Sequence, residues 1–352
     1  MAVPLFSRAS GFGSLFSIIE AEQGAEALQR LRRESGFAVA DFSPSMLVPF
    51  PLMNRVYNLA AKMSGDAEFG ARVGQEFRLE EFGPFLEYAL YGATLGDVIA
   101  RSIHAQPLHS NQLIMDQRVV GGRAHWRLRY QTNAEPTVAH HAQMCLMQTL
   151  STVRRCPGAR KDQIEIHVAE PYAAEARLLE CRLDVTVRSR TNDYELAFPA
   201  HWLRKWMPIS GLPPDLAVEA LAPYRDRPLP RAMAEAVLIA LELHDDLPSG
   251  GIAAVAAEIG RPPRTLQHAL KSEGVTYRQI ARRLRLRRAL RLLATTEKPL
   301  SEVALRVGYT DPSNFHRAFV SQTGMTPGRF RDTTRRHAPS SAGNLETRLD
   351  HP

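Results

Sequence analysis

The chain has 352 residues and a formal net charge of +7; 44% of its residues are apolar and 23% are charged. This composition is typical of a globular protein and excludes a disordered chain, and the length suits two domains that each bury a core. The charge is uneven, because residues 251–340 hold seventeen Lys or Arg and six Asp or Glu, a net of +11, which leaves −4 elsewhere.

The sequence shows no sign of export, membrane insertion or a bound metal. Its first twenty residues lack the ordered basic start, apolar stretch and cleavage site of a secretory signal, and no run approaches the ~20 apolar residues of a membrane span. The three cysteines, Cys145, Cys156 and Cys181, have no metal-ligand spacing. We therefore expect reduced thiols, a cytoplasmic location, no membrane contact and no cofactor.

Residues 1–207 mix helical and strand periodicity, which predicts an α+β domain. The Gly121-Gly122 pair between residues 112–120 and 125–131 predicts a hairpin with a primed turn. Alternating apolar residues predict further strands at 164–168, 183–187 and 194–198. Helices are expected at 15–33, 52–63, 67–77, 84–91, 94–105 with Thr94 as its cap, 138–153, 172–179 and 200–206.

Four large side chains of this domain are candidates for an apolar effector cavity: Trp126, Tyr130, Met144 and Met147. The same spacing fits ordinary core packing, which is the more frequent case. The pair His140 and His141 is not expected to bind a metal, because adjacent helix residues point apart and no further Cys or His completes a tetrahedral set.

Residues 209–230 hold five prolines and several charges, so residues 208–230 are predicted to form a linker with one helix around 216–221. A helix at 231–244 then opens a second domain that is expected to span 231–336, and residues 337–352 are expected to form a flexible tail.

The second domain contains the same unit twice. Helical stripes at 252–259 and 300–307 each end at a glycine, Gly260 or Gly308, and a short second helix follows each one. The inner faces of the second helices carry Leu266 and Leu270 in the first copy and Phe315 and Phe319 in the second. This repeated order of helix, glycine turn and helix predicts an all-α domain with two helix-turn-helix units.

A helix at 277–293, without Gly or Pro and rich in arginine, is expected to join the two units. About 17 helical residues span roughly 26 Å. A rod of that length would hold two recognition helices near the ~34 Å of one DNA turn, so that both enter the major groove on one face of the duplex. The arginines of this helix could line the DNA backbone or pair with groups of the protein, and both readings stay open: Arg278, Arg282, Arg283, Arg285, Arg287, Arg288 and Arg291.

This stretch resembles the DNA-binding domain of AraC/XylS-type transcription regulators. The first unit carries the resemblance at residues 263–267 and 273–274, and the second carries it at 301–304, 307–309, 311–315, 317–319 and 323–327. One departure is Pro262 before Pro263, where the family often has a Ser cap. Losing that cap costs roughly 1 kcal/mol, although Pro is tolerated in a first helical turn.

The outward residues of the two second helices are the candidate DNA contacts. Arg264, Gln267, His268 and Lys271 have the chemistry of base-edge readout, in which Arg pairs with guanine and Gln with adenine. The resemblance makes the second helix mainly a backbone anchor, so Arg317 is expected to contact phosphate first. Its neighbours complete the set, with Ser313 expected as the helix cap: Ser313, Asn314 and His316.

The N-terminal region is similar to the effector domains of AraC-like regulators related to ornithine-utilisation and mycobacterial virulence regulators. Residues 64–66, 69–70, 72–74, 83–84, 86, 88–89, 94–97 and 194–199 carry this similarity. It implies small-molecule sensing and dimerisation.

Together these features favour a non-enzymatic regulator that binds double-stranded promoter DNA and responds to a small organic effector. A homodimer and contact with RNA polymerase are expected. The alternative is a dimeric regulator whose N-terminal domain senses nothing and only dimerises or contacts a protein. An enzyme fused to a DNA-binding domain is disfavoured, because Cys156 lacks the context of a nucleophile.

Overall fold

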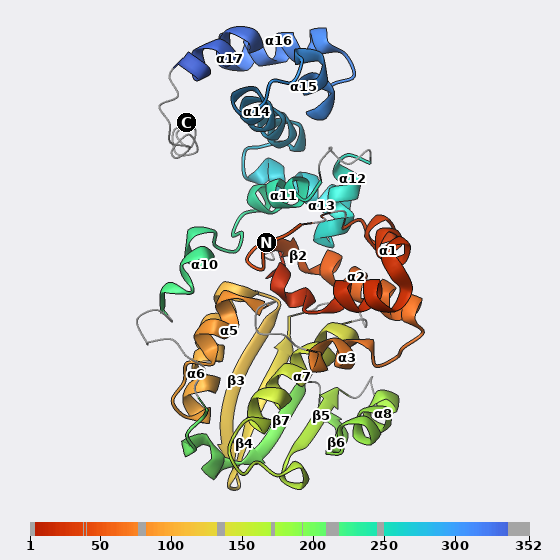
Figure 1. The fold of residues 1–352 in the computed structure, drawn as a ribbon, viewed down its shortest axis with the longest axis vertical. Helices are drawn as coiled ribbons and strands as arrows, with labels where there is room; N and C mark the ends of the chain where they lie inside the picture. The colour runs from red at the N-terminus through yellow and green to blue at the C-terminus, as the bar shows by residue number, and fades with distance from the viewer. Residues whose placement is uncertain are drawn as a thin grey trace.

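The computed structural model describes residues 4–37, 39, 41–76, 82–131, 138–169, 173–191, 193–208, 218–244 and 250–336. The predicted tail at 337–352 and residues 209–217 of the predicted linker lie outside these residues. The molecule is long, with a sheet at one end and the second helix-turn-helix unit at the other (Figure 1).

The N-terminal sheet has five strands in the order β3-β4-β7-β5-β6. Only β5 and β6 are parallel; the other neighbours run antiparallel. The predicted hairpin is confirmed, since Gly121 and Gly122 have φ of 57° and 77°, the two positive values that a primed turn requires. The strands are β3 (Leu113–Val120), β4 (Arg123–Tyr130), β5 (Glu165–Ala169), β6 (Thr186–Thr191) and β7 (Tyr194–Pro199).

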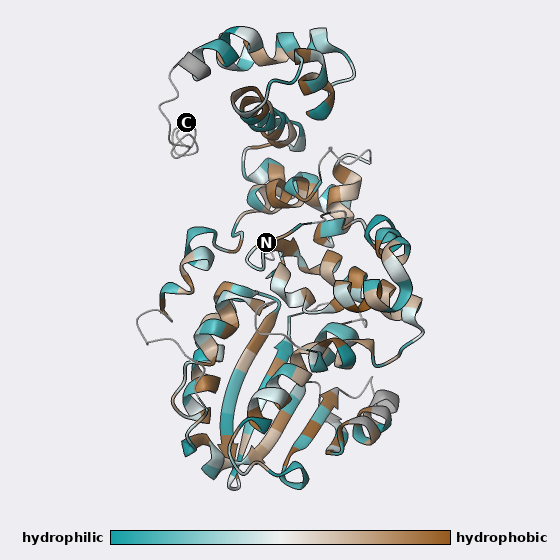
Figure 2. Cartoon of the chain, in the orientation of Figure 1, coloured by the Kyte–Doolittle hydropathy of each residue, from teal (hydrophilic) through white to brown (hydrophobic). Residues whose placement is uncertain are grey.

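Alternation along β4 sets the two faces of this sheet. Trp126 and Leu128 are buried, while His125, Arg127 and Arg129 point to the opposite face. The buried face packs against α7 (Ala139–Arg154), and the teal and brown bands of the strands alternate accordingly (Figure 2). The main core of the domain therefore lies between the sheet and its helices.

The other N-terminal helices follow the predicted apolar periodicity. Thr94 caps its helix through a reciprocal pair of hydrogen bonds with Asp97, as a capping box does. The expected helix at 15–33 is interrupted at Gly24, where φ is 84°. The helices are α1 (Leu15–Ser35), α2 (Phe50–Ser64), α3 (Phe69–Gln75), α5 (Pro84–Ala89), α6 (Leu95–His109), α8 (Ala173–Leu183) and the 3₁₀ turn η4 (Ala200–Arg204).

The predicted strand at 183–187 was placed too early. Leu183 is the last residue of α8, and β6 begins at Thr186. Leu179 and Leu183 are both buried four residues apart, which is the spacing of a continuing helix. The turn between helix and strand is made at Asp184, whose φ is 52°.

A two-stranded sheet of β1 (Phe6–Arg8) and β2 (Leu47–Pro49) joins the two halves of the molecule. Phe6 and Leu47 are fully buried in the same apolar cluster as the first helix-turn-helix unit. The neighbouring Arg8 is also buried, and burial lowers its pKa to about 10. Its guanidinium donates to the carbonyls of Ser45, Tyr224 and Arg227, so it holds the linker helix α10 (Ala222–Asp226) against the sheet of β1 and β2.

The C-terminal part is entirely helical within residues 218–244 and 250–336. It contains two helix-turn-helix units, and the long helix α14 lies between them (Figure 1). Of the predicted linker helix at 216–221, residues 216–217 lie outside the described residues and residues 218–219 are helical, and the helix α10 follows from Ala222. The remaining helices are α11 (Met233–Glu242), α12 (Ile252–Ile259), α13 (Pro263–Ser272), α14 (Tyr277–Thr295), α15 (Leu300–Arg306), α16 (Pro312–Thr323) and α17 (Pro327–Arg336).

Candidate nucleic-acid interface

The first helix-turn-helix unit is α12 and α13, joined through Gly260. Gly260 has φ of 69° and ends α12 in the left-handed conformation. Leu266 and Leu270 anchor α13 in the apolar cluster of this unit. No side chain caps α13 at Pro262, as the double proline predicts.

The outward face of α13 presents all four predicted contact residues. Arg264, Gln267, His268 and Lys271 are exposed, and within the described part of the chain none of them makes a hydrogen bond or ion pair. Because Leu266 and Leu270 fix the opposite side, these polar groups are held on a rigid helix and keep their hydrogen-bonding capacity for a ligand.

The second unit is α15 and α16, with Phe315 and Phe319 buried beneath α16. The prediction that Ser313 caps α16 was wrong. The carboxylate of Asp311 caps it instead and accepts from the backbone N–H of Ser313 at 2.8 Å. A carboxylate before the first turn also matches the positive end of the helix dipole, which favours it over a hydroxyl.

The outward face of α16 carries the remaining predicted contacts. Ser313, Asn314, His316 and Arg317 are all exposed. The guanidinium of Arg317 donates to the side-chain oxygen of Asn314 at 2.5 Å, one turn earlier on the same face. This hydrogen bond uses one of the five N–H donors of Arg317 and leaves the others available for phosphate.

The arginines of α14 divide between internal and outward positions. Arg282 donates to Ser321 Oγ, Arg285 lies over the Tyr309 ring, and Arg287 pairs with Glu242. Arg288 donates to the carbonyls of Leu241 and His244. These arginines tie α14 to the helices around it. Arg278, Arg283 and Arg291 are exposed.

Both faces of α14 also contribute to the packing of the units. Ile280 and Leu284 belong to the apolar cluster of the first unit, whereas Ala289 and Leu293 belong to that of the second. One straight helix of 19 residues therefore sets the spacing between the two units.

Family comparison covers both parts of the chain. Residues 255–333 match the helix-turn-helix domain model, and residues 27–207 match the arabinose-binding domain of AraC transcription regulators. The second match alone spans more than half of the chain. The chain belongs to the AraC family of transcription regulators.

Two curated proteins and one solved structure are similar to this chain. The ornithine utilization regulator of Pseudomonas aeruginosa is 28% identical over 312 residues, which cover 82% of this chain and 86% of that protein. The regulator VqsM of the same organism is 26% identical over 165 residues, or 46% of this chain and 51% of VqsM. The crystal structure of the P. aeruginosa regulator CdpR has a TM-score of 0.39 at 20% identity, covering 90% of this chain and 96% of that one.

The protein is thus an AraC-family DNA-binding transcription regulator with an N-terminal effector-binding-like domain, and the relatives named above are transcription regulators. Among the described residues, no helix is long and apolar enough to cross a membrane, and no group of three or more His, Cys, Asp or Glu is arranged to hold a metal ion.

The predicted effector residues lie in two different settings. Trp126 and Met144 are buried in the main core. Met147 is also buried, and it lines a surface pocket of about 280 Å³. The other residues of this pocket include apolar Leu150 and Leu183 on its wall and two arginines: Gly74, Gln75, Leu150, Ser151, Arg154, Arg155 and Leu183.

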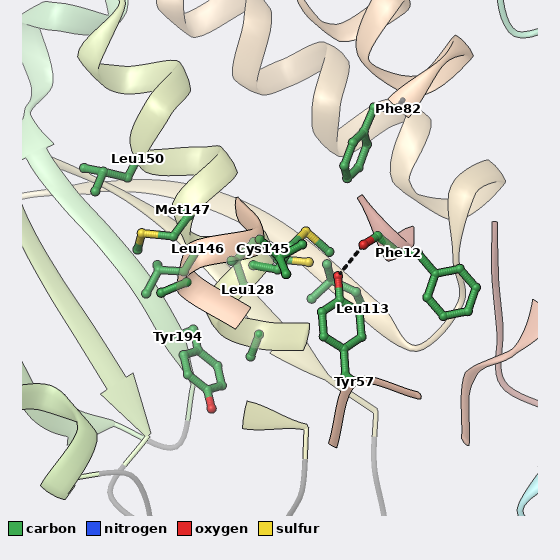
Figure 3. Close-up of a cluster of buried hydrophobic side chains, with 14 of the residues drawn as sticks. Phe12, Tyr57, Phe82, Leu113, Leu128, Cys145, Leu146, Met147, Leu150 and Tyr194 are labelled. Atoms are coloured by element: carbon green, nitrogen blue, oxygen red, sulfur yellow. Dashed lines mark hydrogen bonds between the residues drawn. The ribbon is translucent and has the colours of Figure 1, made fainter. Parts of the chain in front are cut away.

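Tyr130 belongs to a buried polar group at the contact of β4, α7 and α2. Its hydroxyl lies 2.8 Å from Nδ1 of His141, and the rings of Phe50 and Tyr57 meet the same imidazole edge to face. Burial lowers the pKa of His141 to about 3 and raises that of the Cys145 thiol to about 12, so both are uncharged at neutral pH. Figure 3 shows Tyr57 and Cys145 within this core, with the Tyr57 hydroxyl donating to the Phe12 carbonyl.

Sequence reasoning missed the contact between the two halves of the molecule. Pro51 of α2 lies against Gly260, and Arg55 of α2 is half-buried near Glu258 of α12. Glu258 is buried and lies 2.8 Å from Nε2 of His244. The sequence contained one signal of this contact. Glu258 is the only charged residue of α12 and follows the buried Val255 by three residues, which places its carboxylate on the buried side of the helix.

Proposed function

We propose that this regulator reads two successive major grooves of promoter DNA with α13 and α16, and that a small organic effector controls this binding. The observation that carries the DNA part is the shared rod: α14 packs into the clusters of both units and spans roughly 28 Å. That length is close to the ~34 Å between equivalent groove positions one turn apart.

The two recognition helices are assigned different tasks. On α13, Arg264 and Gln267 have the geometry-specific donors and acceptors that distinguish guanine and adenine edges; His268 and Lys271 complete that face. On α16, Arg317, Asn314, Ser313 and His316 anchor the helix to phosphate, because a guanidinium partly held by Asn314 is a fixed charge at the first turns of the helix.

Sequencing of genomic DNA bound by the purified protein tests the two-groove proposal. We expect enriched sites with two short elements about one helical turn apart. Hydroxyl-radical footprinting on one such site should show protection on one face of the duplex. A site with a single element, or protection around the whole duplex, would contradict the proposal.

The effector part rests on the way α2 connects the N-terminal core with the first unit. One face of α2 places Phe50 and Tyr57 on the buried His141, while Pro51 and Arg55 meet α12. A change in packing around His141 therefore reaches the helix that precedes α13. An effector can use this connection only if it binds one arrangement of α2 better than another.

The pocket beside Met147 is the proposed entry point for the effector. It combines apolar Met147, Leu150 and Leu183 with Arg154 and Arg155, a lining that suits a small molecule with a carboxylate. A thermal-shift screen of small carboxylates tests this. Ornithine belongs in the screen because the ornithine utilization regulator is similar to this chain along most of its length.

A stabilising compound should lose its effect in Arg155→Ala and keep it in Arg30→Ala, an exposed arginine on α1. If no compound shifts the melting temperature, the alternative gains support: a ligand-independent dimeric regulator whose N-terminal domain only dimerises or contacts a protein. In either case we propose a homodimer that acts on promoter DNA together with RNA polymerase.

A further inference from the structure

The outer strand β3 has an unusual surface for a sheet edge. It has one strand neighbour, β4, and it is the first strand in the sheet order. Among the described residues, three of the large exposed apolar side chains lie on it: Ile114, Val119 and Val120, which are 38%, 53% and 56% exposed. An edge strand with exposed apolar residues is a template for pairing with another chain.

The neighbouring structure buries Leu113 at the start of this strand and leaves residues 114 and 118–120 exposed. β1 pairs with Ser110, just before β3 begins, and α6 packs beside β3. Val119 and Val120 remain more than half exposed despite both contacts. The opposite edge differs: β6 carries no large exposed apolar side chain among its described residues, and it presents Arg188, paired with Glu165.

We propose that β3 of one copy pairs antiparallel with β3 of a second copy about a two-fold axis at Gln117. The side chains of β3 are self-complementary about that residue. Asp116 then faces the partner's Arg118, and Ile114 faces the partner's Val120, all on the solvent side of the sheet. On the other side of the sheet, Met115 faces the partner's Val119. Such an isologous contact closes at two copies.

The register is fixed by the same side chains. A slip of one residue turns every side chain of one strand to the other face of the sheet. Asp116 would then lie opposite the partner's Val119 instead of the partner's Arg118. The ion pairs of each copy also leave Asp116 and Arg118 able to pair across the contact. Asp116 already accepts from Arg127 and Arg129, and Arg118, which is 49% exposed, reaches Glu195. A carboxylate has lone pairs left for a further donor.

This inference rests on the proposed homodimer and names its surface. Light scattering on the full-length chain after size exclusion tests it. Wild type should be a dimer, and Asp116→Arg or Arg118→Asp should each raise the dimer dissociation constant about tenfold or more, because two attractive pairs become repulsive. An equimolar mixture of the two variants should dimerise again, since Arg then faces Asp in every pair.

A matched control variant and a cross-link distinguish loss of the β3 contact from general misfolding of the variants. Arg188→Asp, on the opposite edge strand, should leave the dimer intact. In a Cys181→Ser background, Gln117→Cys should form a disulfide-linked dimer on mild oxidation, because directly opposed residues bring their Cβ atoms within reach. This variant keeps Asp116 and Arg118, so it decides the question if the charge variants fold poorly.

The outcomes distinguish the surface from the proposed function. A dimeric wild type without the cross-link, or with charge variants that stay dimeric, overturns the β3 surface and leaves the homodimer standing. A monomeric wild type overturns both. DNA binding by the helix-turn-helix units is measured separately by fluorescence anisotropy on a duplex, where monomeric charge variants should retain binding to a single site.

Discussion

At the residue scale, the two recognition helices present arginines in different settings. Arg264 has no partner within the described part of the chain, whereas Arg317 is tied to Asn314. A free guanidinium can adapt to a base edge, and a tethered one offers a fixed charge to the backbone. The two residues should therefore affect DNA binding in different ways.

Arg264→Ala should relax sequence preference more than it weakens nonspecific binding, at a cost of about 1–3 kcal/mol on the preferred site. Competition anisotropy with specific and scrambled duplexes measures this difference. Equal losses on both duplexes for Arg264→Ala would remove it from base readout.

Arg317→Ala should weaken binding to both duplexes alike and reduce the salt slope by about one.

Glu195 is the centre of a second residue-scale feature, a charged cluster on the solvent side of the sheet. Its Oε1 lies 2.6 Å from His125 Nδ1 and 3.0 Å from His167 Nδ1. Burial alone would raise the pKa of Glu195, but hydrogen bonds from His167 and His125 lower it to about 2. The hydrogen bond to Glu195 in turn raises the pKa of His167 against the opposing effect of burial.

The signs of these shifts define a pH window. The lowered pKa of Glu195 contributes stability above its ordinary value of 4.5, and that stability is lost as pH falls toward 2. The raised pKa of His167 contributes stability below its ordinary pKa of 6.5, and that stability is lost as pH rises through the pKa of the folded state.

Glu195→Gln should lower the unfolding free energy by about 1–3 kcal/mol near pH 6 and by less at pH 8. Urea unfolding at both pH values measures this; equal losses would contradict the coupling.

At the scale of elements, the sequence predicted what periodicity and turn chemistry determine. The Gly-Gly hairpin, the Thr94 cap and the paired helix-turn-helix stripes follow from local residue types, and all are present. The start of β6 was misjudged because Leu183 fits a helix and a strand equally well. At α16 the sequence analysis chose Ser313 as the cap, but Asp311, two residues earlier, is also a capping residue type, and only backbone geometry decides between them.

The identity of the α16 cap gives an element-scale prediction. Asp311→Ala should destabilise the second unit by about 1 kcal/mol, since a backbone N–H then loses its partner. Ser313→Ala is the matched control and should change stability little. Hydrogen exchange of α16 compares the two variants, and the small cluster around Phe315 and Phe319 makes local opening detectable. A larger effect from Ser313→Ala than from Asp311→Ala would return the cap to Ser313.

At the scale of the whole molecule, the docking of the two halves could not be predicted from local pattern, and Glu258 was its one sequence signal. Neither Phe6 nor Leu47 lies in an element that the sequence predicted, yet both are buried with helices that lie about two hundred residues further along the chain. Arg8 likewise holds α10 through backbone carbonyls, which carry no sequence signature. Contacts of this kind depend on tertiary arrangement and not on local pattern.

Gly260 offers the sharpest test of this docking, because it sits at the turn before α13 and faces Pro51. A Cβ at residue 260 would lie 2.7 Å from Cγ of Pro51, and φ there is 69°. Gly274 has a similar φ of 74° but nothing within 4 Å, so Gly274→Ala measures backbone strain alone, about 1–2 kcal/mol. Gly260→Ala should cost more and should increase hydrogen exchange in β2 and α2, far from the mutation in sequence. Pro51→Ala removes the closest atom and should restore part of that loss. If Gly260→Ala and Gly274→Ala behave alike, α2 does not hold the first unit, and the proposed route from the His141 cluster to α13 fails with it.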